Sequence, residues 1–97
     1  MYQYMSYIRH FEREETQEPC AIIIENKRIS ALMQNFSRMG AKLLTAERLP
    51  LRQYVVLIYR TERNELVRML AYVVHSSSRG NYFVSGLHFI GLEGRQQ

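Results

Sequence analysis

CAIIIENKRISALM, residues 20–33, gives the clearest fold signal in the chain, because two apolar segments flank four polar residues. Both segments have the composition of β-strands, and Asn26 tolerates the positive φ that a two-residue hairpin turn needs. We therefore predict a β-hairpin that turns at Asn26 and Lys27. Its register would put the apolar side chains on one face, with Ile24 opposite Ile29, Ile22 opposite Ala31 and Cys20 opposite Met33.

Further short apolar segments follow this hairpin, and turn residues separate them. Gly86 interrupts the last segment, and a glycine within a strand commonly marks a bend or a close backbone approach. Turn signals recur roughly every 8–12 residues and no crossover helix is evident, which predicts an all-β antiparallel barrel or sandwich of about five or six strands. The later strands are predicted at residues 41–44, 54–59, 65–75 and 82–90, with reversals at 60–64 and 76–81.

The length of 97 residues allows one compact core and excludes two. Polar residues dominate the N-terminal part, whereas apolar residues crowd the remainder. We predict an N-terminal arm at residues 1–17, a β-barrel at residues 18–93 and a C-terminal tail at residues 94–97. The arm is expected to be flexible or to form a short helix.

Arginine supplies most of the positive charge. The formal net charge is +4, and Lys27 and Lys42 are the only lysines. This composition favours an anionic partner because guanidinium groups match phosphates and base edges. A solvated basic surface is the simpler explanation of the charge taken alone.

Cys20 is the only cysteine, so an internal disulfide is excluded, and we expect a reduced core residue and a cytoplasmic location. The N-terminal residues lack the basic start and apolar run of a signal peptide. No later run approaches the ~18 apolar residues of a membrane helix. We therefore expect neither secretion nor a membrane span.

Two polar motifs carry the functional signal. Arg9 and Arg13 form an RxxxR pair, and Asn35, Ser37 and Gly40 form an NxSxxG pattern after the hairpin. Together they offer guanidinium forks, a carboxamide, a hydroxyl and a glycine backbone, which can hold a guanine nucleotide.

The predicted hairpin register also brings the two motifs together. It places Asn35 beside Glu18, at most roughly 17 Å of extended chain from Arg13, so the arm needs only to fold over. The simpler alternative is a plain strand-to-turn connection. In that case Asn35 and Ser37 bond the local backbone and Gly40 supplies a positive φ.

These motifs resemble the signature of the PilZ family of bacterial cyclic di-GMP receptors, which has RxxxR before its first strand and [D/N]xSxxG after its second. The ending GLHFIGL, residues 86–92, is also similar to the glycine-hydrophobic-phenylalanine ending of these domains. The resemblance covers nearly the whole chain. It implies a six-stranded antiparallel barrel in which Arg9 and Arg13 bind phosphate or guanine.

The resemblance also implies roles for the second motif. Asn35 and Ser37 should bond the guanine edge, and Gly40 should allow close backbone approach or the tight turn. Arg38 either adds a phosphate contact or is a solvent-facing charge.

The function implied is that of a receptor in which cyclic di-GMP orders the arm over the barrel and so regulates a downstream effector protein, in motility, biofilm or pilus control. The ligand would bind singly or as a stacked pair. The alternative is a PilZ-like adaptor that binds no nucleotide and acts through protein contacts. A barrel for single-stranded nucleic acid is the less favoured third reading, and its tyrosines would need to share one open face.

Catalysis finds little support in the sequence. His10, His75 and His88 show no ligand spacing with one another or with Cys20, and no nucleophile or phosphate-loop motif is present. We therefore expect no enzyme activity, no metal site and no cofactor.

Overall fold

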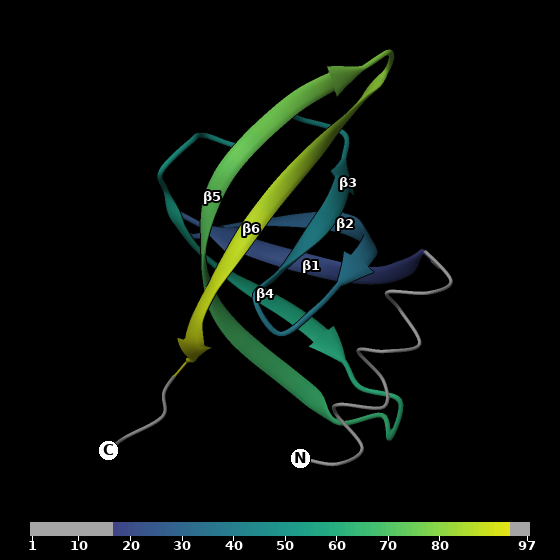
Figure 1. Cartoon of the computed structure of the whole chain (residues 1–97), viewed down its shortest axis with the longest axis vertical. Coiled ribbons are helices and arrows are strands. Elements are labelled where there is room, and N and C mark those ends of the chain that lie inside the picture. The colour runs from purple at the N-terminus through teal and green to yellow at the C-terminus, as the bar shows by residue number, and fades with distance from the viewer. Residues whose placement is uncertain (1–16, 94–97) are drawn as a thin grey trace.

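The computed structural model describes residues 17–93, which form a closed barrel of six antiparallel strands (Figure 1). The order around the barrel is β1-β2-β3-β6-β5-β4, and pairing between β1 and β4 closes it. The predicted all-β class and six-stranded antiparallel barrel are thus confirmed. The predicted tail and almost all of the predicted arm lie outside the described residues. The strands are β1 (Glu18–Ile24), β2 (Lys27–Phe36), β3 (Gly40–Thr45), β4 (Tyr54–Arg60), β5 (Leu66–Arg79) and β6 (Tyr82–Leu92).

The barrel interior is filled by alternate residues of the strands, as the period of two along a strand requires. Phe36 is fully buried, and its ring meets Tyr59 edge-on at 5.0 Å and Phe89 at 5.5 Å between ring centroids. Burial of each such apolar side chain stabilises the fold by about 1.5–3 kcal/mol. The core also contains Ile22, Ile24, Ile29, Ala31, Met33, Ala41, Leu43, Leu49, Val55, Leu57, Met69, Ala71, Val73 and Leu87.

The first hairpin forms where predicted, but the predicted register is wrong by two residues. Its turn residues are Glu25 and Asn26, both with positive φ, at 50° and 65°, as the favoured two-residue hairpin turns require. Ile24 therefore pairs with Lys27 and Ile22 with Ile29. Moving a turn by one residue shifts the pairing by two, so every apolar side chain keeps its predicted face.

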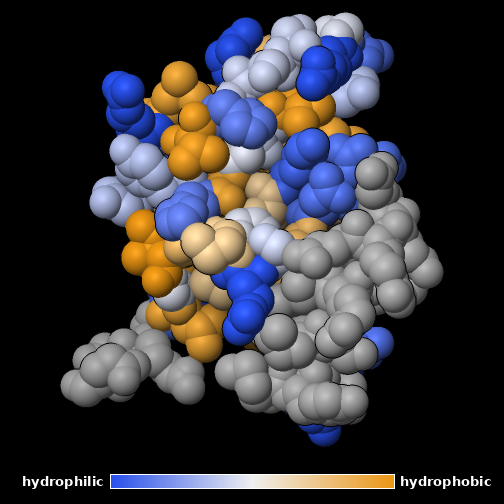
Figure 2. All heavy atoms as spheres, in the orientation of Figure 1, coloured by the Kyte–Doolittle hydropathy of each residue, from blue (hydrophilic) through white to orange (hydrophobic). Residues whose placement is uncertain are grey.

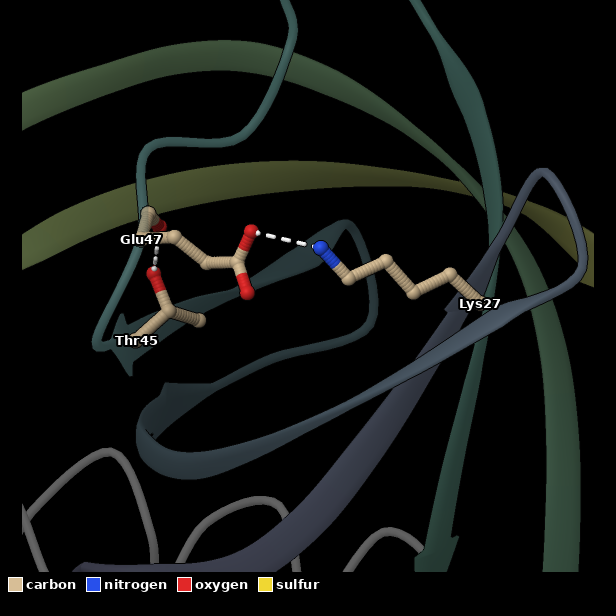
Figure 3. A network of polar contacts seen from close by, with 3 residues as sticks. All are labelled: Lys27, Thr45 and Glu47. Carbon is tan, nitrogen blue, oxygen red and sulfur yellow. Dashed lines mark hydrogen bonds and ion pairs between the residues drawn. The ribbon is translucent and has the colours of Figure 1, made fainter.

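Contacts from neighbouring loops hold this hairpin in its observed register. Lys27 reaches from the hairpin to Glu47, with 3.0 Å between Nζ and Oε1, and Thr45 donates to the Glu47 carbonyl at 2.6 Å (Figure 3). On the other side of the turn, Gln53 donates to Glu25 at 2.8 Å. The contacts of Lys27 and Gln53 are exposed, and an exposed ion pair contributes about 0–1 kcal/mol.

The β5–β6 hairpin bends the sheet and extends beyond the other strands (Figure 1). Its ladder has two register shifts, between Leu70 and Ala71 and between Val73 and His75, and such bulges increase local twist. The reversal predicted at 76–81 begins too early, because β5 continues to Arg79 and the turn follows at Gly80, whose φ is 74°. The serines before the turn are strand residues that pair with β6.

Candidate functional site

The end of β2 places Asn35 on the outer face of the barrel. A register shift between Met33 and Asn35 inserts one extra residue into β2 relative to β3. Because Met33 and Phe36 are both fully buried, Asn35 and its partner Lys42 face outward. Bulges of this kind re-aim side chains beside binding sites. Asn35 thus belongs to the strand and not to the turn that was predicted for the whole motif.

Ser37 organises the connection between β2 and β3. Its N–H donates to the Gly40 carbonyl at 2.9 Å, and its hydroxyl oxygen accepts from the Met39 N–H at 3.1 Å. The hydroxyl also donates to the Gly40 carbonyl over a long 3.4 Å. This is the local backbone bonding that the simpler alternative predicts for Ser37.

Gly40 is required by close packing against β6. A Cβ atom added at Gly40 would lie 2.0 Å from the Leu87 carbonyl oxygen. The φ angle of Gly40 is not positive. The adjacent Met39 carbonyl accepts from the Phe89 N–H at 2.8 Å. This close packing is with the neighbouring strand, and the close approach to a ligand that the resemblance implies for Gly40 stays a prediction. The positive φ of the simpler alternative is absent.

Arg38 lies exposed in the connection between β2 and β3. Within residues 17–93 no carboxylate forms an ion pair with it. Lys42 is half-buried on the same outer face, beside Asn35. The surface around the motif therefore presents positive charge.

A groove that the sequence analysis did not identify opens next to Asn35. Leu32 and Leu44 pair across β2 and β3 on the same outer face, on the far side of the bulge from Asn35. The groove measures about 480 Å³, within the usual range for ligand pockets. Its lining is made of Gln17, Leu32, Leu44, Thr45, Ala46, Asn81 and Tyr82. Sequence offers no signal for it, because its walls come from four separate segments.

The chain enters the barrel beside this surface. Glu18 pairs with Met33 and not with Asn35, because of the two-residue change in register. The entry point is still close to the motif, and Gln17 lines the groove. Arg9 and Arg13, the other predicted site residues, lie outside the described residues.

Cys20 lies partly buried and packs against the core. Burial raises the pKa of the Cys20 thiol to about 12, so the thiol stays protonated and packs as a small apolar group. In the part of the chain that is described, no group of three His, Cys, Asp or Glu residues could hold a metal ion. The same part contains no helix with the length and apolar character needed to cross a membrane.

Between residues 17 and 93, the tyrosines are distributed in a way that does not match a base-stacking platform. Tyr54 and Tyr72 pair on the outer face of β4 and β5, with ring centroids 5.2 Å apart. Tyr59 is buried in the core, and Tyr82 lines the groove beside the β5–β6 turn. Within residues 17–93 the tyrosines therefore do not share the single open face that the nucleic-acid reading requires.

Comparison with known proteins identifies the family. No curated protein matches the sequence. A family model described as PilZ domain matches residues 7–97, nearly the entire chain. The match includes both polar motifs, the six strands and the described groove. PilZ domains are typically signalling modules that bind cyclic di-GMP, and some members bind no ligand. On the strength of this match and of the six-stranded antiparallel barrel, the chain belongs to the PilZ domain family.

Proposed function

We propose that this protein is a cyclic di-GMP receptor in which the ligand orders residues 1–17 against the outer face of the barrel. The observation that carries the proposal is the PilZ match over residues 7–97. The outward position of Asn35 and the positive surface around it give physical support. An outer-face site can be reached by an arm that enters the barrel next to it.

Each arginine of the RxxxR pair has a role in this proposal. Arg9 and Arg13 bond phosphate oxygens in a bidentate manner or contact the guanine edge and face. Asn35 bonds the guanine edge through its carboxamide. Arg38, exposed beside the turn, adds a phosphate contact.

In this proposal Ser37 contacts the ligand directly, whereas Gly40 positions the residues that do. The long 3.4 Å bond from the Ser37 hydroxyl to the Gly40 carbonyl is weak, so a ligand oxygen or nitrogen can replace it at small cost. Gly40 instead keeps the turn against β6 and so holds Asn35 and Ser37 in place.

The output of the proposed receptor is a new protein surface. Ordering the arm over the barrel joins arm residues and barrel residues into one continuous face, which an effector protein can recognise. Motility, biofilm matrix and pili are the processes that the family implies. The receptor would work in the cytoplasm, without a metal or cofactor and without catalysis.

One observation favours the adaptor as a second candidate. Exposed apolar side chains lie on the outer face of the barrel, including Tyr54 at 61%, Val74 at 51% and Ile90 at 53% exposure. Figure 2 shows hydrophobic patches among hydrophilic side chains on the face that β5 and β6 present. Such patches suit a protein partner with or without a nucleotide.

Calorimetric titration of the full chain tests the proposal. The titrants are cyclic di-GMP, GTP and a short oligonucleotide, and the variants are Arg13→Ala, Ser37→Ala and the control Arg63→Ala in the exposed β4–β5 turn. We expect micromolar binding of cyclic di-GMP alone, weakened about tenfold or more by Arg13→Ala and about threefold or more by Ser37→Ala. The control should not differ from the wild type. Absence of heat with cyclic di-GMP would favour the adaptor, and salt-sensitive oligonucleotide binding would favour a nucleic-acid partner.

A further inference from the structure

A row of four residues crosses the outer face of the barrel next to the NxSxxG motif. Asn35 of β2 pairs with Lys42 of β3, Lys42 pairs with Gly86 of β6, and Gly86 pairs with His75 of β5. Adjacent strands lie about 4.8 Å apart, so the row spans roughly 14 Å. One residue of the proposed site, Asn35, and two unassigned side chains, Lys42 and His75, thus share one surface.

Burial of the neighbouring residues shows that this row faces outward. Ser85 and Leu87, on either side of Gly86, are 0% and 4% exposed and face the core. His75 follows the register shift after Val73, and its side chain is exposed. The bulge is what turns His75 to the outer face, since Val73, two positions before it, is fully buried.

The imidazole of His75 lies across Gly86. A Cβ atom added at Gly86 would be 2.4 Å from Nε2, 2.7 Å from Cδ2 and 3.1 Å from Cε1 of His75. The ring therefore occupies the space that a side chain at position 86 would take, and it leans from β5 towards Lys42 on β3. Gly86 accordingly makes room for an aromatic ring on the strand that lies between His75 and Lys42.

The charge around the row is one-sided. The adjacent outer row on one side consists of Gly40, His88 and Tyr72, and the row on the other side consists of Leu44, Val84 and Ser77. Neither contains a carboxylate. Among the described residues of these three rows, no carboxylate neutralises the charge of Lys42. This favours an anionic ligand.

We infer that Lys42 and His75 are further ligand-binding residues of this protein, an inference that rests on the proposed function. The Lys42 ammonium contacts a phosphate of the cyclic dinucleotide, and the His75 imidazole stacks on a guanine. Ammonium groups bind phosphate as point charges, and stacking of a base on an aromatic ring is worth about 1–3 kcal/mol by alanine substitution. The ligand then lies along the row from Asn35 to His75.

Affinity for cyclic di-GMP, measured by calorimetry on the full chain, tests this inference. The variants are Lys42→Ala, His75→Ala, His75→Phe, Gly86→Ala and the double variant His75→Ala/Gly86→Ala. Controls are Lys27→Ala, a lysine that bonds Glu47, and Tyr54→Ala, an exposed ring on β4. Arg13→Ala reports on the proposed function, and a thermal melt of each unliganded variant reports on folding.

We expect about tenfold weaker binding for Lys42→Ala and for His75→Ala, and a loss of no more than about threefold for His75→Phe, which keeps a ring. Gly86→Ala should weaken binding by displacing the imidazole, but it should have no further effect in the His75→Ala background. Ring protons of His75 should also shift upfield in the NMR spectrum on ligand binding. These results, with unchanged controls, would support the inference.

Two outcomes would overturn it, and they differ. If the wild type binds and Arg13→Ala weakens binding, while Lys42→Ala and His75→Ala stay within twofold of the wild type, the inference fails and the proposed function survives. If the wild type shows no binding of cyclic di-GMP, both fail.

Discussion

Gly40 has a structural role that its place in a ligand-binding motif does not reveal. The motif spacing identifies the residue, but the reason for a glycine lies in β6, where the Leu87 carbonyl oxygen occupies the space of a side chain. That contact joins residues far apart in sequence, so local pattern cannot predict it. The NxSxxG pattern of Asn35, Ser37 and Gly40 is therefore visible in the sequence, whereas the packing of Gly40 against β6 is not.

Gly40→Ala should destabilise the fold. A Cβ atom 2.0 Å from a backbone oxygen forces β3 and β6 apart, and overpacking of this kind costs about 2–3 kcal/mol. Urea unfolding measures the change. Gly91→Ala is the matched control, because nothing lies within 4 Å of a Cβ added there, and its stability should change by less than about 0.5 kcal/mol. Equal effects of the two substitutions would contradict the packing role of Gly40.

Cys20 should make stability fall at alkaline pH. Its pKa is raised to about 12 in the folded state, against about 8.5 in an unfolded chain, so between these values the unfolded state binds fewer protons. The folded thiol therefore stabilises fully below about pH 8.5, and the contribution declines by about 1.4 kcal/mol per pH unit above it. Urea unfolding from pH 8 to pH 10, compared between the wild type and Cys20→Ala, isolates this decline. Parallel curves for the two proteins would contradict it.

At the scale of the elements, the faces of the first hairpin were predictable but its register was not. The alternation of apolar residues fixes which side chains point inward. A change of strand register by two residues leaves each side chain on the same face. The observed turn at Glu25-Asn26 is accompanied by contacts of Glu25 with Gln53 and of Lys27 with Glu47 in another loop. Sequence alone does not bring those residues together.

The row from Asn35 to His75 was unpredictable for a related reason. Two bulges, one in β2 after Met33 and one in β5 after Val73, turn Asn35 and His75 outward. A strict period of two starting from the buried residues Met33 and Val73 would point both side chains into the core. Single-residue bulges leave no clear mark in one sequence.

The loop between β3 and β4 should contribute strongly to stability although it contains no strand. Leu49 is fully buried in the core, and its N–H donates to Ser76 at 3.1 Å, whereas Leu51 is 57% exposed. Leu49→Ala should cost about 2–5 kcal/mol, and Leu51→Ala should cost less than about 0.5 kcal/mol. Denaturant unfolding of both variants measures the difference. A small effect of Leu49→Ala would show that the loop is not part of the cooperative core.

At the scale of the whole molecule, the proposed receptor uses the barrel as a rigid frame for half of its binding site. Asn35, Ser37 and Gly40 are held by β2, β3 and β6, while Arg9 and Arg13 belong to the chain that enters the barrel at Glu18. The family match covers both halves. The central claim is that cyclic di-GMP brings the two halves together.

Amide hydrogen exchange of the full chain, with and without saturating cyclic di-GMP, tests this claim most directly. Because the ligand is proposed to bond both halves, exchange should slow in residues 9–13 and in residues 35–42 at the same ligand concentration. At a ligand concentration near the wild-type Kd, Arg13→Ala should strongly reduce both changes together. Unchanged exchange at both segments, or slowing in the barrel with none in residues 9–13, would contradict the account.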